Sequence, residues 1–325
     1  MVEMTCYIDI TSKKSGIVRT FQRIHSVQIK SSRKTLTDTA IIKLANVKSL
    51  LDGSNKKISV GDKVEISLGY NGSNNLEFTG YVSEIKASSP LEIMCEDEMW
   101  QLKQEHIEKG WKKITLKEML NFILPNSDTS ECPDIDLSPF TIQPMSKAKA
   151  LEKLKDEFGI DVYFRDKKLF AGVPYTESNP NHIKYHFQKN VPTTMHQSGL
   201  TFKKKEDVKI KFVAVSKQDD NKEVKVELGD DDGEIHTLHV PHLNLNKEQL
   251  MKIAQIEIDK LKYTGYRGVL KTFGMPIAKH NDVAELTDAL LPDKNGKFFI
   301  DSVETNYGPS GFNRQVELGL ISNSK

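Results

Sequence analysis

The chain has 325 residues, and its 46 lysines and arginines against 45 aspartates and glutamates give a formal net charge of +1. This length suits two or three domains and is enough to bury a sizeable core without disulfides or metals. The balanced charge disfavours a protein whose main task is to coat DNA or an anionic membrane, because both partners attract a basic excess.

The N-terminal sequence and the distribution of apolar residues indicate a protein made and assembled in the cytoplasm. No stretch approaches the roughly 18 consecutive apolar residues of a membrane span. Glu3 and Asp9 lie where a signal peptide would carry cations followed by apolar residues. We therefore expect no insertion into a membrane.

Three cysteines, Cys6, Cys95 and Cys132, are far apart, and none forms a Cys-x-x-Cys pair. This spacing excludes a structural zinc site built on thiolates and disfavours a disulfide framework. Cys95 ends a run in which apolar residues alternate with polar ones. It is therefore predicted to be a small buried strand residue rather than a reactive thiol.

Residues 1–104 are nearly all strand-like and predict an antiparallel meander that closes into a barrel or sandwich. Apolar residues alternate with polar ones over 64–68, 78–82 and 91–95, as in strands with one buried face. The turn residues Asn71-Gly72 separate the first two of these strands.

Two glycines lie inside these predicted strands, Gly69 and Gly80. Glycine in a strand marks a bulge or a place where another backbone comes close. We therefore expect that neither position tolerates a side chain.

Residues 105–182 change in character and predict a small α+β domain inserted between β blocks. Thr115–Glu118 has the pattern of a capping box that begins one helix, and Ser146 is the N-cap of a second. A hairpin over 160–173 follows. Residues 174–182, rich in proline, asparagine and serine, are interpreted as the exit linker.

From residue 206 to 325 the chain returns to strands, which predicts a second β-barrel-like domain. One helix is expected at about 246–262, because Asn246 is a candidate N-cap with Gln249 three residues later. Since the insert interrupts a β block, part of 183–205 is expected to return and complete the first barrel. The predicted fold class is therefore mainly β with an α+β insert.

The segment His236–His242 is the strongest candidate for a metal site. Its three histidines are spaced by three residues, which would suit a helix, but Pro241 prevents a helix from running through. On a strand His236 and His239 face opposite sides, so we favour a surface strand that enters a loop. The nearby Gly229–Glu234 lacks the ligand frame of an EF-hand and is interpreted as a hairpin turn.

Other charged runs also have plain structural interpretations. Glu96–Glu98 could perform acid–base chemistry in a cleft, but the apolar residues that follow favour the end of a strand entering a packed segment. Lys203–Lys205 is followed at once by two acids, which favours a solvated turn. The sequence has no GxSxG, HExxH, P-loop or GxGxxG motif. It therefore predicts no catalytic residue, no metal site and no cofactor.

Two series of segments resemble one known family, the phage late-control protein D family, which are the baseplate hub proteins of contractile tails. The segments similar to the family's first tube domain are Val60–Gly72, Phe78–Ile85, Ile93–Asp97 and Leu102. Those similar to its second tube domain are Tyr263–Tyr266, Gly274–Pro276, Val283–Leu286, Gly296–Val303 and Gly311–Leu318. The insert at 105–182 is similar to the family's interposed domain.

The sequence departs from the family pattern at Ala278–Val283, where the family usually turns with Pro-Gly-Asp before a valine. Asn281 can adopt the left-handed conformation that glycine would supply, so we expect the turn to survive.

The resemblance implies a structural protein rather than an enzyme. Family hubs form a homotrimer in which each chain contributes two tube domains, so that six barrels make a ring with pseudo-sixfold symmetry. The ring joins a hexameric tail tube to a trimeric spike. The implied partners are the tail tube protein, the spike protein and the tape-measure protein, with DNA or an effector only passing through the lumen. The implied location is the baseplate of a virion tail, a prophage tail or a related injection particle.

Two alternatives stay open at this stage. One is a tail-associated cell-wall hydrolase with its carboxylates in the insert, where Glu118, Glu131, Asp134 and Asp136 are available. The other is a stand-alone β module that binds carbohydrate or protein.

Overall fold

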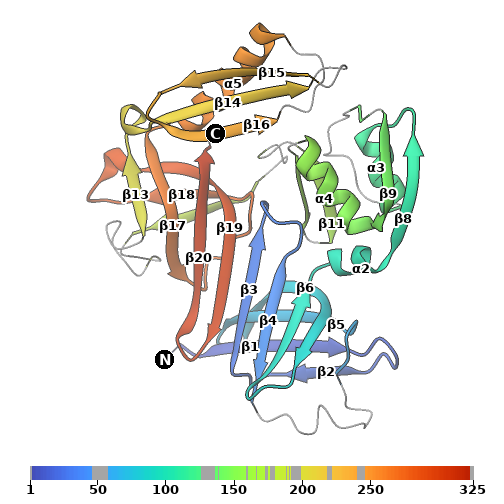
Figure 1. Ribbon diagram of the computed structural model, residues 1–325. Coiled ribbons are helices and arrows are strands. Elements are labelled where there is room, and N and C mark those ends of the chain that lie inside the picture. Colours follow the sequence, from blue (N-terminus) through green and yellow to red (C-terminus); the bar gives the residue numbers. More distant parts are fainter. Residues whose placement is uncertain are drawn as a thin grey trace.

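Figure 1 shows the computed structural model of the chain, in which strands dominate and the predicted mainly β class is confirmed. The structure describes residues 2–45, 58–125, 136–137, 139–158, 160–165, 167–172, 175, 180–187, 189, 191, 199–217, 222–239 and 246–322. Cys132 and Gly159 lie outside the described residues, as do most of the predicted linker and the segment from 240 to 245.

The first seven strands form the N-terminal unit, drawn in blue and cyan in Figure 1. They are β1 (Met4–Thr11), β2 (Val18–Phe21), β3 (Ser26–Ser32), β4 (Thr39–Leu44), β5 (Lys63–Tyr70), β6 (Ser73–Lys86) and β7 (Leu91–Glu96). All pair antiparallel in the order β3-β4-β7-β6-β5-β1-β2. Alternate side chains point into one core, which is why the sequence shows a period of two.

Several predictions for this unit are confirmed. Cys95 is 1% exposed on β7. A β-carbon added to Gly69 would lie 1.9 Å from the carbonyl oxygen of Ser73, and one added to Gly80 would lie 2.1 Å from that of Glu96. Both glycines therefore mark places where a neighbouring backbone comes too close for a side chain.

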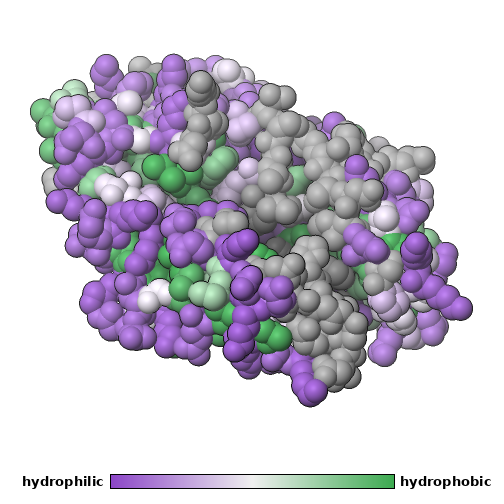
Figure 2. Space-filling model, turned by 90° about the horizontal axis from the view of Figure 1, so that it is seen from above, coloured by the Kyte–Doolittle hydropathy of each residue, from purple (hydrophilic) through white to green (hydrophobic). Residues whose placement is uncertain are grey.

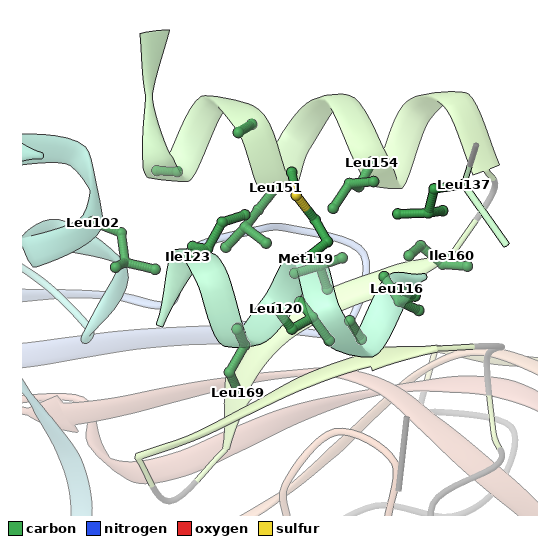
Figure 3. Close-up of a cluster of buried hydrophobic side chains, with 14 of the residues drawn as sticks. Leu102, Leu116, Met119, Leu120, Ile123, Leu137, Leu151, Leu154, Ile160 and Leu169 are labelled. Carbon is green, nitrogen blue, oxygen red and sulfur yellow. The ribbon is translucent and has the colours of Figure 1, made fainter. Parts of the chain in front are cut away.

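The insert has its own core between helices and strands. Its elements are α2 (Met99–Gln104), β8 (His106–Trp111), α3 (Leu116–Ile123), β9 (Phe140–Ser146), α4 (Lys147–Phe158), β10 (Asp161–Arg165) and β11 (Lys168–Gly172). Figure 3 shows Leu151 and Leu154 of α4 lying against Met119 and Leu120 of α3. The sequence did not predict α2 or the β8–β9 pair.

Both predicted helix starts in the insert are confirmed. The Thr115 side chain accepts a hydrogen bond from the backbone amide of Glu118, whose carboxylate accepts one from the Thr115 amide. This reciprocal pair satisfies two amides that the helix leaves without partners. The Ser146 hydroxyl accepts from the amide of Lys149 at 3.2 Å.

The C-terminal unit consists of six strands around a third core. They are β12 (His182–His186), β13 (Leu200–Lys203), β17 (Gly265–Phe273), β18 (Val283–Thr287), β19 (Gly296–Gly308) and β20 (Gly311–Ile321). Between β13 and β17 the chain forms a smaller unit with a fourth core. In it α5 (Lys247–Leu261), the predicted helix, covers a sheet of β14 (Ile210–Lys217), β15 (Glu223–Gly229) and β16 (Glu234–His239).

The structure corrects the prediction that part of 183–205 completes the first barrel. Strand β12 pairs in parallel with β18, and β13 pairs antiparallel with β17, so both belong to the C-terminal unit. The physical reason is hydrophobic burial, because Tyr185 and Phe187 are 0% and 4% exposed inside the C-terminal core. The predicted boundaries at residues 104 and 182 stay predictions.

The N-terminal and C-terminal units share one sheet. Strand β19 pairs with β3 over six residues, from Ser302 opposite Ser32 to Tyr307 opposite Val27. Thirteen described strands are thereby joined by hydrogen bonds. Phe312 of β20 is 3% exposed and lies in the N-terminal core. Strands from the first and last parts of the sequence thus lie side by side, although the N- and C-termini are at opposite ends of the view in Figure 1.

Candidate functional site

The described part of the histidine segment lies in the smaller unit that α5 and β14–β16 form. His236 and His239 are in β16, which confirms the predicted strand, and His242 lies outside the described residues. The His236 side chain is 36% exposed, with Glu234 at 3.9 Å. In the described part of the chain, no group of three or more histidine, cysteine, aspartate or glutamate side chains is arranged to hold a metal ion.

The prediction of a hairpin turn at Gly229–Glu234 is wrong. Strands β15 and β16 lie on opposite sides of β14, so the segment crosses over an intervening strand. Asp230 fixes this crossing, because its carboxylate accepts a hydrogen bond from the amide of Ile210 at 2.9 Å and its own amide donates to the Ile210 carbonyl at 2.8 Å.

The structure draws attention to charges that the sequence analysis did not single out. Three buried arginines, Arg33, Arg165 and Arg314, each come from a different unit and each reach into another unit. We call them the arginine bridges. Lone arginines have no sequence pattern that marks them, because their partners are distant in the sequence.

Arg33 follows β3 and ties the N-terminal unit to both others. Its guanidinium donates to Asp161 of β10 at 2.7 Å, to Asp301 of β19 at 2.8 Å and to the Tyr175 hydroxyl at 2.6 Å. The side chain is 12% exposed. Burial lowers the pKa of Arg33, but Asp301, Tyr175 and Asp161 more than offset that effect and raise it. Arg33 therefore stays charged.

Arg165, at the end of β10, ties the insert to the C-terminal unit. It donates to the Asp282 carboxylate at 2.6 Å and to the His280 carbonyl at 3.0 Å. Asp282 also accepts from the amide of Lys279 at 2.8 Å, so the turn before β18 is held from both sides. Asn281 has φ of 64° in this turn, which confirms the left-handed conformation expected there.

Arg314 of β20 ties the C-terminal unit back to the N-terminal unit. Its side chain is 1% exposed and forms a forked pair with the Glu77 carboxylate of β6, which is 5% exposed. It also donates to the Gly274 carbonyl at 2.8 Å and to the Thr305 hydroxyl at 2.7 Å. Planar, bidentate geometry of this kind is the strongest form of an arginine–carboxylate contact.

A cavity of about 100 Å³ lies where the three units meet. Ile29 and Phe78 come from the N-terminal unit, Phe164 from the insert, and Val303 and His280 from the C-terminal unit. Asp38 and Asp97 also line it. Asp97 belongs to the acidic run after β7, but it is 6% exposed rather than solvated.

The buried arginines and carboxylates bind one another or backbone groups. The cost of removing one partner of such a pair is large, because the other charge is left in a medium of low polarity. The junction therefore fixes the relative position of three separately cored units.

The outer edges of the shared sheet are a second feature. At one end, β2 pairs only with β1 among the described strands. At the other, β13 pairs with Gly265–Gly268, and no described strand pairs with that side of Val269–Phe273. Ile17 and Val18 near the first edge are 50% and 54% exposed, and Phe273 at the second is 47% exposed. Seen from above in Figure 2, the coloured surface is mainly hydrophilic, with hydrophobic residues in separate areas.

No family model matches the chain, and no curated protein matches it in sequence. Solved structures do match. A tail protein from Neisseria meningitidis superposes with a TM-score of 0.64 at 12% identity, over 99% of this chain and 97% of that one. The chain has the fold of a phage tail protein.

Two further structures extend the likeness. The 43 kDa tail protein of prophage MuSo2 from Shewanella oneidensis gives a TM-score of 0.61 at 13% identity, over 97% of both chains. A component of the E. coli type VI secretion system gives 0.61 at 8% identity, over 97% of this chain and 77% of that one. The resemblance to phage tail proteins inferred from the sequence is thus confirmed for the fold. In the described part of the chain, no helix is long and apolar enough to span a bilayer.

Proposed function

We propose that this chain is a structural baseplate hub of a contractile phage tail or a related injection system. Three copies form a ring that joins the tail tube to the central spike. The observation that supports this most is the match of nearly the whole chain to a tail protein over nearly that protein's whole length. The type VI secretion component is itself described as similar to two bacteriophage T4 tail proteins.

The open sheet edges support assembly with further copies. An unpaired strand edge exposes backbone N–H and C=O groups that another chain can pair with. The edge at Val269–Phe273 and the edge at β2 lie at opposite ends of one sheet. A contact of one edge with the other is head-to-tail, and such contacts form a ring when the rotation from one copy to the next closes. In the proposed ring the edge of one copy meets the opposite edge of the next.

The proposed role is structural rather than enzymatic. The hydrolase alternative needs free carboxylates in the insert, but the Glu118 carboxylate is engaged in the helix cap. Glu131 and Asp134 lie outside the described residues. The likeness to tail proteins along the whole chain also favours the hub over a stand-alone binding module.

The proposed partners follow from this role. They are the tail tube protein on one side of the ring, the spike protein on the other and the tape-measure protein, with DNA or an effector passing through the lumen. The hub would assemble in the bacterial cytoplasm and reside in the baseplate of a virion tail or injection particle.

The sequence predicts the first tube domain at 1–104 and the inserted domain at 105–182, and the proposed division moves the first of these boundaries to the end of β7. The second tube domain takes up the rest of the chain, with β14–β16 and α5 as an addition to it. Four separate buried clusters support this division. Helix α2 packs into the core of the insert through Met99 and Leu102, so the first boundary lies close to β7.

The test is assembly with purified cognate tube and spike proteins, read as the mass of the complex. We expect three copies of this chain per complex and at least about 2,000 Å² buried at each interface. Phe273→Glu, at one open edge, should lower the trimer fraction. Ile235→Glu, at a position that is also exposed but on β16, is the control. A chain that stays monomeric with both partners present contradicts the proposal.

A further inference from the structure

We propose that Asp38 and Asp97 form a proton-binding pair at the meeting point of the three units, so that the junction closes with a proton bound there and loosens when it is lost. This inference concerns the single chain and does not depend on the proposed role in a tail. We call the two residues the acid pair.

The backbone holds the acid pair together. Asp38 immediately precedes β4 and Asp97 immediately follows β7, and these strands are neighbours. The amide of Asp38 donates to the Asp97 carboxylate at 3.0 Å, and the amide of Asp97 donates to the Asp38 carbonyl at 3.1 Å. The second bond joins the two backbones, and the first holds the Asp97 carboxylate against the Asp38 amide, so the two acidic residues stay beside one another.

Each carboxylate lies inside the molecule. The Asp38 side chain is 15% exposed, and Asp97 is 6% exposed. Asp38 accepts hydrogen bonds from the Ser31 hydroxyl at 2.5 Å and the Ser32 amide at 3.0 Å. Asp97 accepts one from the Met99 amide at 3.0 Å. These uncharged donors stabilise a negative charge on the two carboxylates, but they do not neutralise it.

The charged groups around the cavity come from every unit. The acids are Glu77 and Glu98 of the N-terminal unit, and the bases are Arg165 and Lys167 of the insert and Lys279, His280 and Arg314 of the C-terminal unit, with Lys103 of α2 near Asp97. Three of these cations are engaged with other carboxylates. Arg165 binds Asp282, Arg314 binds Glu77, and Lys103 binds Glu96 at 2.7 Å.

His280 is the group through which the acid pair faces the C-terminal unit. Its Nε2 atom is 4.0 Å from the Asp38 carboxylate, and its ring packs edge-on against Tyr163 of the insert at 4.6 Å between centroids. Its carbonyl accepts from Arg165. A change of charge at Asp38 therefore alters the electrostatic energy of the contacts that His280 makes between the units.

The ionisation of the pair follows from burial. Burial raises the pKa of Asp38 to about 7. Burial, and then the negative charge of Asp38, raise the pKa of Asp97 well above its usual value. The folded junction thus binds more protons near neutral pH than the open one. By linkage, the stability of the junction is full below about pH 4 and is lost as the pH rises through about 7.

The experiment is hydrogen exchange of the full chain between pH 5 and 8, corrected for the intrinsic pH dependence of exchange. For one linked proton, the opening constant of residues 31–39 and 277–283 should rise about tenfold per pH unit up to pH 7. Amides of β5, deep in the N-terminal unit, should keep their protection. No rise at either segment overturns the proposal.

Variants identify the group that binds the proton. Asp38→Asn should remove most of the pH dependence at both segments, and Asp97→Asn should reduce it. Glu98→Gln is the matched control, because it lines the same cavity but should keep the wild-type profile. If His280 were the titrating group, stability would instead fall as the pH drops, since a buried neutral histidine must become charged. That sign, or an Asp38→Asn variant with the wild-type slope, contradicts the proposal. If either variant does not fold, the wild-type profile and its sign still decide.

Discussion

Arg314 and Glu77 show at the scale of single residues why the junction is rigid. Both side chains are almost fully buried, and two hydrogen bonds join the two guanidinium NH2 groups to the two carboxylate oxygens. A buried ion pair adds little to the folding stability compared with a well-packed apolar pair, because both ions lose their hydration. Its main effect is specificity, since any other arrangement of the two units leaves a charge unpaired.

Removal of one partner of this pair should therefore destabilise the fold strongly. We expect Arg314→Leu to lower the free energy of unfolding by about 3–5 kcal/mol, because Glu77 is left buried and unpaired. The measurement is urea denaturation. Adding Glu77→Leu should recover part of the loss. Lys63→Ala, which removes an exposed pair with Glu65, should cost less than about 1 kcal/mol. If Arg314→Leu and Lys63→Ala lowered the free energy of unfolding by the same amount, this account would be contradicted.

Gly80 presents a backbone constraint rather than a charge. A β-carbon there would lie 2.1 Å from the Glu96 carbonyl oxygen, so β6 and β7 would have to move apart. We expect Gly80→Val to cost about 1–3 kcal/mol through this strain. Gly110→Ala is the control, because its β-carbon would meet nothing closer than 3.5 Å. A Gly80→Val variant that melts with the wild type would show that the β6–β7 approach is looser than described.

At the scale of elements, local sequence signals specify helices and long-range pairing specifies sheets. Helix α3 begins at a capping box whose two hydrogen bonds involve residues only three apart. Strand β12, in contrast, pairs with β18 about 100 residues later, and its partner is chosen by hydrophobic burial. The capping box can be recognised in a short stretch of sequence, whereas the β12–β18 pairing cannot.

The cap of α3 offers a measurement at this scale. We expect Thr115→Ala to lower the stability by about 0.5–2 kcal/mol, because the amide of Glu118 loses its acceptor, whereas the bond from the Thr115 amide to the Glu118 carboxylate remains. Thermal melting monitored by circular dichroism reports the change. Thr115→Ser keeps the hydroxyl and should stay close to the wild type. Loss of stability in both variants alike would point to packing rather than to the cap.

For the whole molecule, three arginine bridges and a shared sheet join cores that would otherwise be independent. Separate domains of this size usually move relative to one another unless their interface is extensive. Here a single residue, Arg33 of the N-terminal unit, contacts partners in both the insert and the C-terminal unit. We therefore describe the three units as one mechanical body, which suits a part that transmits force between a tube and a spike in the proposed function.

Cooperative unfolding is the corresponding expectation for the whole chain. In calorimetry the wild type should show one main transition. Arg33→Leu should separate an earlier transition of the insert, because Asp161 and Asp301 lose their common partner. Lys30→Leu is the control and should leave one transition, because Lys30 lies in β3, three residues before Arg33, and its side chain is 59% exposed. Independent transitions already present in the wild type would contradict the rigid description.

The sequence by itself determined what depends on neighbours along the chain. The alternation over β5–β7, the starts of α3, α4 and α5, the burial of Cys95 and the left-handed Asn281 were all predicted and are confirmed. Each depends on a local period, a cap or a turn conformation. The ordered segments of the two tube domains also carried the resemblance to tail proteins.

Only the tertiary structure decided what depends on residues far apart in sequence. The return of β12 and β13 to the C-terminal unit, the β3–β19 pairing, the arginine bridges and the burial of Asp97 have no local signature. A strand pairs where it buries the most apolar surface. A charged side chain is desolvated only when groups that are distant in the sequence surround it. Neither quantity exists until the chain has folded.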